Sequence, residues 1–255
     1  MHKRAMRSAV SCIFVFSSLV APTLADEMSH PCAFGLSVSG LFEGQGRGDT
    51  LLLQDTDQRF VPADIVLGEV GGAIDSQTLQ PGDRLNLHFG DQTVDRYGRQ
   101  PAHVFRQDQW LQGGLLARGE ALALPITQSG PCHKALLDAE SKNTARRGRH
   151  WRSRGVEIDA TDLEGLATRL GQFAMVTGRV RSVGDRKSRL YLNFGGNWAH
   201  DFTVSVAKRG AGKFTGDLGR LIGLTGRTVQ VRGVLEDNRG PLIRVIDDVQ
   251  IKVIK

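Results

Sequence analysis

The last third of the chain is a series of short apolar runs separated by turn residues, and this pattern leaves few folds open. From Phe173 onward the runs read AMVTGRVRSV, RLYLNF, DFTVSV, TVQVRGVLE and PLIRVIDDVQIKVI. Most of them alternate apolar and polar residues, as half-buried strands do. About five such runs within about 85 residues are typical of a small closed barrel. We therefore predict a β-rich, barrel-like domain over residues 170–255.

The preceding part of the chain combines strands with helices. Two apolar runs around a polar turn predict a hairpin over residues 49–61, and residues 85–105 hold a second pair of strands. Apolar residues at helical spacing predict one helix over 110–119, which ends at a glycine cap, and a second over 135–145. Strands followed by helices favour a small barrel or curved sheet with packed helices over residues 26–151.

Charge divides the chain in a similar way. Residues 26–151 carry 12 Lys and Arg against 16 Asp and Glu, whereas residues 170–255 carry 15 against 7. Between them, residues 152–169 have few large apolar residues at a firm period, so we predict a linker with one short helix. The basic excess of the last third favours an anionic partner. The aromatic residues there either stack on the bases of a single strand or, as is more common, pack in the core: Tyr191, Phe194, Trp198 and Phe202.

The first 25 residues are typical of a cleaved secretory signal. They begin with the basic MHKRAMR, continue with the apolar SAVSCIFVFSSLVA and end in small residues at Ala25. No later segment reaches the roughly 20 consecutive apolar residues that a membrane-spanning helix needs. We therefore expect an exported protein, periplasmic or secreted, without a membrane span.

Removal of the signal would leave two cysteines, Cys32 and Cys132, because Cys12 lies within the signal. An even pair in an oxidising compartment predicts one disulfide. The alternative is a pair of buried free thiols. A zinc site would need further ligands at ligand spacing, and none is visible.

The stretch DRYGR at residues 95–99 allows two interpretations. It is a tight turn between apolar strands, so Arg99 could form a surface ion pair with Asp95. The same turn could instead direct the guanidinium of Arg99 at a phosphate group. The choice decides whether the turn has a structural or a functional role.

Several motifs between residues 38 and 151 resemble the thermonuclease (staphylococcal nuclease-like) family, in its exported bacterial branch. They are, in chain order, GDT at 48–50, ADIVLGE at 63–69, DRYGR followed by AHVF, WLQGGLLARGEA at 110–121 and the helix that ends at Trp151. The later LYLNFGGNW and DFTVSVAKR resemble the β-rich domain attached to many exported members. The resemblance implies a mainly β fold with α: an OB-fold nuclease-like barrel with packed helices, plus a second small β-barrel domain. It also implies calcium-dependent cleavage of nucleic-acid phosphodiesters.

The resemblance carries three site residues over by motif. It places Asp49 and its neighbour Thr50 at the calcium ion and Arg99 on the phosphate. In this chemistry a hard cation with oxygen ligands polarises the phosphate. A glutamate orients or deprotonates the attacking water, and arginines neutralise charge that develops on the phosphoryl oxygens. Ca²⁺ is the only cofactor that the resemblance implies.

The remaining site residues depend on the register of the strand at 59–69. One register keeps Glu69 as the general base, but valines at positions 61 and 66 then replace the arginine and the aspartate of the family. A register slid by two residues supplies Arg59 for the phosphate and Asp64 for the metal, yet leaves a leucine at the glutamate position. We favour the first register because ADIVLGE resembles the strand and exit of this family branch.

Two functions follow from this incomplete motif. The first is a calcium-dependent nuclease acting on DNA or RNA with a degenerate active site. The second is a catalytically disabled homologue that serves as a nucleic-acid-binding, polyanion-binding or structural module of the cell envelope. Loss of a charged group at such a site can cost roughly 10²–10³ in rate, which favours the second.

Overall fold

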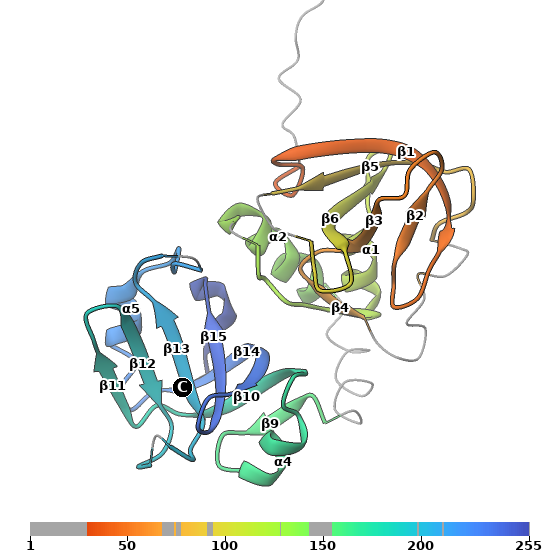
Figure 1. Ribbon diagram of the computed structural model, residues 1–255. Helices are drawn as coiled ribbons and strands as arrows, with labels where there is room; N and C mark the ends of the chain where they lie inside the picture. The colour runs from red at the N-terminus through yellow and green to blue at the C-terminus, as the bar shows by residue number, and fades with distance from the viewer. Residues whose placement is uncertain are drawn as a thin grey trace, which may run out of the picture.

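Strands predominate in the computed structural model of this protein (Figure 1). The structure describes residues 30–67, 74, 78–90, 94–127, 129–142, 155–197, 199–210 and 212–254. The predicted signal, Glu69 and Trp198 lie outside the described residues. No helix within those ranges is both long and apolar enough to span a membrane.

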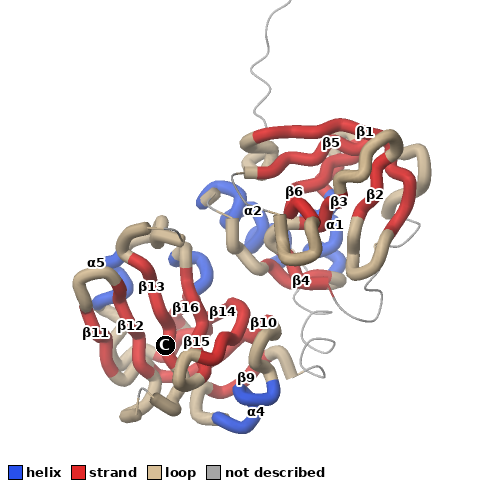
Figure 2. The backbone as a smooth tube through the Cα atoms, in the orientation of Figure 1, coloured by secondary structure: helices blue, strands red, loops and turns tan. Residues whose placement is uncertain are grey.

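Five strands in the N-terminal part close into a barrel (Figure 2). β1 (Leu36–Gln45) pairs with β2 (Leu51–Leu53), and β2 pairs with β3 (Arg59–Pro62), both antiparallel. β3 then runs parallel to β6 (Arg99–Arg106), and β5 (Arg84–Phe89) lies antiparallel between β6 and β1. The order β1-β2-β3-β6-β5 and back to β1 is compatible with an OB-like barrel.

The alternation in the sequence explains the barrel interior. Every second residue of the short strands points inward, and these positions hold the largest fully buried side chains of the barrel: Leu51, Leu53, Phe60, Leu85 and Leu87. The hairpin predicted for residues 49–61 is confirmed by the pairing of β2 with β3. The strand pair predicted within residues 85–105 is confirmed by β5 and β6.

Two helices pack beside the barrel, and a disulfide ties the start of the chain to one of them. β7 (Gln109–Trp110) leads into α1 (Leu111–Arg118), which ends at Gly119 in the left-handed conformation with φ of 74°, as predicted. α2 (Gly130–Ser141) begins several residues earlier than predicted, with Cys132 in its first turn. Cys132 is bonded to Cys32, which confirms the predicted pairing. β4 (Ile65–Leu67) leaves the barrel and pairs with β8 (Ala121–Ala123).

The C-terminal part forms a second sheet with the order β11-β12-β13-β15-β14-β10-β9, to which β16 adds by pairing with β14. Its strands are β9 (Glu157–Asp159), β10 (Phe173–Arg179), β11 (Ser182–Asp185), β12 (Arg189–Asn193), β13 (Thr203–Ala207), β14 (Thr228–Asp237), β15 (Pro241–Val245) and β16 (Ile251–Val253). The short helices are α4 (Leu163–Thr168), α5 (Leu218–Ile222) and η1 (Asp248–Gln250).

The segment predicted as a linker belongs to this second sheet. β9 runs parallel to β10, and Val156, Ile158 and Leu166 are buried. The sequence pattern missed this strand because three residues are too few to show a period. A short helix was predicted here, and α4 confirms it.

A small apolar core and a buried ion pair join the two parts. The apolar core contains Leu122, Leu124, Val156, Phe173 and Met175. Beside it, Arg232 of β14 donates from Nη1 to Glu140 Oε2 of α2 at 2.8 Å and to the carbonyl O of Ala123 at 3.1 Å. Both charged residues are buried, with exposed fractions of 2% for Glu140 and 9% for Arg232.

We expect Glu140→Gln to lower the free energy of unfolding by about 3 kcal/mol, because it leaves the charge of Arg232 buried without its partner. The double variant Glu140→Leu/Arg232→Met should recover most of that loss, since an apolar pair needs no charge compensation. Urea titrations of the three proteins test this. A double variant that loses as much stability as Glu140→Gln, or more, would show that the loss does not come from an unpaired buried charge.

Candidate functional site

The DRYGR turn is a closed hairpin corner. Asp95 Oδ1 accepts hydrogen bonds from the backbone N–H groups of Tyr97 at 2.8 Å and Arg99 at 3.0 Å. Asp95 Oδ2 accepts from Nε of Arg99 at 2.8 Å and lies 2.7 Å from its Nη2. Gly98 has a φ of 73°, which glycine adopts without strain. The interpretation of Arg99 as the ion-pair partner of Asp95 is therefore confirmed.

The guanidinium of Arg99 also reaches the turn between β1 and β2. Its Nη1 donates to the carbonyl O of Gly48 at 2.5 Å. Burial raises the pKa of the neighbouring Asp49 carboxyl, and the positive charge of Arg99 offsets this only in part. Thr50 is buried, and its hydroxyl donates to the carbonyl O of Arg47 at 2.6 Å. The GDT motif thus forms a turn in which Asp49 carries its negative charge less readily than an exposed aspartate.

A second arginine lies beside the first. β3 and β6 run parallel with Arg59 directly opposite Arg99. Their inward-facing neighbours, Phe60 and Gln100, are buried, so alternation places both arginines on the outer face of the barrel. The structure therefore brings Arg59, Arg99 and Asp49 to one end of the barrel.

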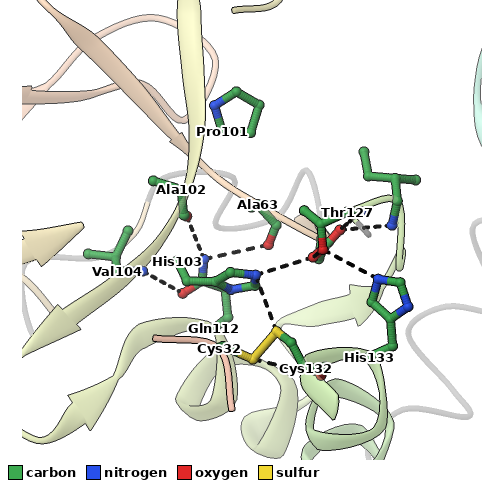
Figure 3. Close-up of polar contacts among 12 residues, drawn as sticks. Cys32, Ala63, Pro101, Ala102, His103, Val104, Gln112, Thr127, Cys132 and His133 are labelled. Atoms are coloured by element: carbon green, nitrogen blue, oxygen red, sulfur yellow. Dashed lines mark hydrogen bonds and ion pairs between the residues drawn. A yellow bond between two sulfur atoms is a disulfide. The ribbon is translucent and has the colours of Figure 1, made fainter. Parts of the chain in front are cut away.

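Both carboxylate oxygens of Asp64, the other predicted metal ligand, accept hydrogen bonds within the protein, and Figure 3 labels two of the contacting residues, His103 and Thr127. Asp64 is 2% exposed. Its Oδ1 accepts hydrogen bonds from the backbone N–H groups of Ile126 at 2.8 Å and Thr127 at 2.9 Å. Its Oδ2 accepts from the Thr127 hydroxyl and lies 3.2 Å from His103 Nε2. Burial alone would raise the pKa of Asp64, but the hydrogen bond and charge of His103, together with Thr127, hold it below its usual value.

Strand geometry separates Asp64 from the arginine pair. β3 starts with Arg59 beside Arg99 and continues along β6, so that Asp64 arrives beside His103. His103 lies four residues beyond Arg99, which at the rise of a β-strand corresponds to roughly 13 Å. Asp64 therefore lies beside His103 of β6 and not beside Arg59 or Arg99.

The described residues do not fit a calcium site. Ca²⁺ takes roughly six to eight oxygen ligands, and its affinity depends on the number of charged ones. Asp49 has a raised pKa, both oxygens of Asp64 accept hydrogen bonds, and Glu69 lies outside the described residues. Within the described ranges, one group of three or more His, Cys, Asp and Glu side chains is close enough to share an ion: Cys32, His103 and Cys132. The two sulfurs of that group are joined in the disulfide.

Buried residues that were not predicted as site residues extend the contacts of Asp64. His103 Nε2 lies 3.3 Å from Cys132 Sγ, and Thr127 Oγ1 lies 3.3 Å from His133 Nε2. On its other side, His133 Nδ1 lies 3.1 Å from Asp247 Oδ2 of the C-terminal part. Isolated histidines and threonines form no sequence pattern that identifies their partners.

The aromatic residues of the C-terminal sheet differ in burial. Phe194 and Phe202 are buried, with ring centroids 4.9 Å apart, so core packing is confirmed for them. Tyr191 lies on the outer face and is partly exposed. Trp198 lies outside the described residues.

Comparison of the sequence with known protein families finds no match, and comparison with curated proteins finds none either.

The substitutions Asp49→Asn and Asp64→Asn form a matched pair, because both residues have a φ near 60°, which asparagine also tolerates. We expect Asp49→Asn to keep or raise the melting temperature, since burial disfavours its charge. Asp64→Asn should cost about 3 kcal/mol, because it removes a buried acceptor of charge-assisted hydrogen bonds. Thermal melts in calcium and in chelator test both expectations. Calcium should not change the melting temperature of wild type or of either variant.

The pH dependence of the same pair gives a second readout. Folding lowers the pKa of Asp64. Its carboxylate therefore stabilises the fold above about pH 4, and this stabilisation is lost as the pH falls through the folded-state pKa. Asp64→Asn should therefore show a flatter loss of stability in acid than wild type. A calcium-induced rise in melting temperature that both substitutions abolish would contradict this assignment.

Proposed function

We propose that this protein is an exported, thermonuclease-like protein of the cell envelope that binds nucleic acid or another polyanion without cutting it. The observation that carries the proposal is the burial of Asp64, whose two carboxylate oxygens accept hydrogen bonds within the protein. A cation beside Asp49 would lack this second carboxylate. The basic composition of the last third supports an anionic ligand.

The order of the elements and turns along the chain supports the proposal of a thermonuclease-like protein. The closed barrel, the two helices and the GDT and DRYGR turns stand in the order of that family. Arg59 and Arg99 lie side by side, as two phosphate-binding arginines would. Arg99 is already held by Asp95 and Gly48, however, so its role in the turn persists without any substrate.

We also propose that the C-terminal sheet is a second barrel domain. β10 and β11 are separated by Val180 and Arg181 alone, and they pair with β14 and β12 respectively. Counted as one bent strand, they give the order β10/β11-β12-β13-β15-β14 and back to β10. This order is the same as that of the N-terminal barrel, with a parallel pair, β13 and β15, at the equivalent place.

The first experiment is incubation of single-stranded and duplex DNA with the purified protein, in calcium or in chelator. We expect no cleavage above that of Arg99→Ala and Glu69→Ala, while DNA is still retained in a mobility-shift assay. The logarithm of the binding constant should fall linearly with the logarithm of the salt concentration, because binding releases counterions. Calcium-dependent cleavage that disappears in both variants would overturn the proposal and would assign the activity to the site that contains Arg99 and Glu69.

A further inference from the structure

The outer face of the C-terminal sheet carries a pocket with a volume of about 470 Å³. It lies over β11, β12 and β13 and against the turn that joins β14 to β15. Its size falls in the range of roughly 300–1,000 Å³ that is usual for ligand pockets. Among its lining residues are Gly184, Arg186, Tyr191, Asn193, Asn238 and Arg239.

The pairing of β11 with β12 leaves room beside the ring of Tyr191. Leu190 and Leu192 are fully buried, so alternation turns Tyr191 and Asn193 to the outer face. The residue opposite Tyr191 on β11 is Gly184. A Cβ atom at that glycine would meet no atom closer than 3.9 Å. The missing side chain therefore opens the pocket at the aromatic residue.

Positive charge lies on two sides of this opening. Arg186 directly follows β11, and Arg239 lies in the turn between β14 and β15. Arg186 is exposed, and its side chain has no hydrogen bond or ion pair to the other described residues. The acidic residue of the lining, Asp201, accepts a hydrogen bond from the backbone N–H of Asn197 at 2.6 Å. The polar groups thus favour a ligand that is anionic and carries hydrogen-bonding edges.

We propose that this pocket binds single-stranded nucleic acid, with one base stacked on Tyr191 and the adjoining phosphates at Arg186 and Arg239. Single strands are held by positive grooves combined with aromatic faces, because an unpaired base exposes its ring for stacking. Asn193 and Asn238 also line the pocket and offer amide groups to the edge of that base, although Asn193 Nδ2 also donates to Ser182 Oγ at 3.1 Å. A paired base keeps its faces inside the duplex and cannot enter the pocket. This inference rests on the proposed function and names its ligand and its site.

Binding is measured by fluorescence anisotropy of a labelled oligothymidylate with the full chain, at several salt concentrations. Tyr191→Ala should weaken binding roughly 5- to 100-fold with an unchanged salt dependence, because it removes stacking alone. Arg186→Gln should reduce the slope of log K against log salt by about 0.7, the loss of one phosphate contact. Gly184→Leu should weaken binding by filling the space beside the ring, and circular dichroism checks its fold.

Two controls separate the pocket from the rest of the surface. Arg227→Gln removes an exposed charge at the opposite end of β14 from Asn238, so it should leave the affinity for oligothymidylate nearly unchanged. Tyr97→Ala removes the only other tyrosine of the chain, which lies in the DRYGR turn. A larger loss in Tyr97→Ala than in Tyr191→Ala would move the site to the N-terminal barrel.

The outcomes distinguish this inference from the proposed function. If wild type binds oligothymidylate and Tyr191→Ala, Arg186→Gln and Gly184→Leu bind it equally well, the pocket is not the site and the proposed function stands. If duplex DNA or heparin competes as well as the single strand and Tyr191→Ala has no effect, the site recognises charge without base stacking and the ligand assignment is wrong. If wild type binds none of these polyanions, the proposed function fails as well.

Discussion

The buried carboxylate of Asp64 connects three parts of this protein. It caps the chain at Ile126 and Thr127 through two backbone N–H groups, and it faces His103 of β6, which in turn contacts the disulfide. Through Thr127 and His133 the contacts reach Asp247 in the C-terminal part. A carboxylate can be buried in this way only when its oxygens receive enough donors to replace water. The ends of the barrel strands, the start of α2 and the contact with the second sheet are therefore fixed together.

This arrangement limits what the N-terminal barrel can do. A carboxylate used to stabilise the fold cannot also turn toward a metal ion without leaving buried donors unpaired. The charge that remains at the other end of the barrel is a pair of arginines beside Asp49, of which Arg99 is bound into its own turn. Such a group can contact an anion but lacks a set of oxygen ligands. The polar pocket of the C-terminal sheet offers an open aromatic face and an unpaired guanidinium within the described chain.

Much of the fold could be predicted from the sequence, because the signals involved are local. Two apolar runs around a turn located the strands that contain Leu51 and Phe60, and alternation located the strand that contains Leu87. A glycine marked the end of α1. The strand β9 was missed because it is short. The site was predicted less well: Asp64 has the motif spacing from Arg59, yet its neighbours His103 and Thr127 come from 39 and 63 residues away. The spacing of residues along one strand does not show which residues of a neighbouring strand they will lie beside.

The sequence by itself indicated most of the strands, the two helices, a disulfide between two cysteines and the uneven distribution of charge. Each of these follows from residue type and local period, which do not depend on distant contacts. The tertiary structure alone decided which charged groups are usable. Closing β3 against β6 placed Arg59 beside Arg99 and sent Asp64 into the interior. Whether a carboxylate serves as a ligand or as a buried support depends on its donors, and those donors are assembled only when the barrel closes.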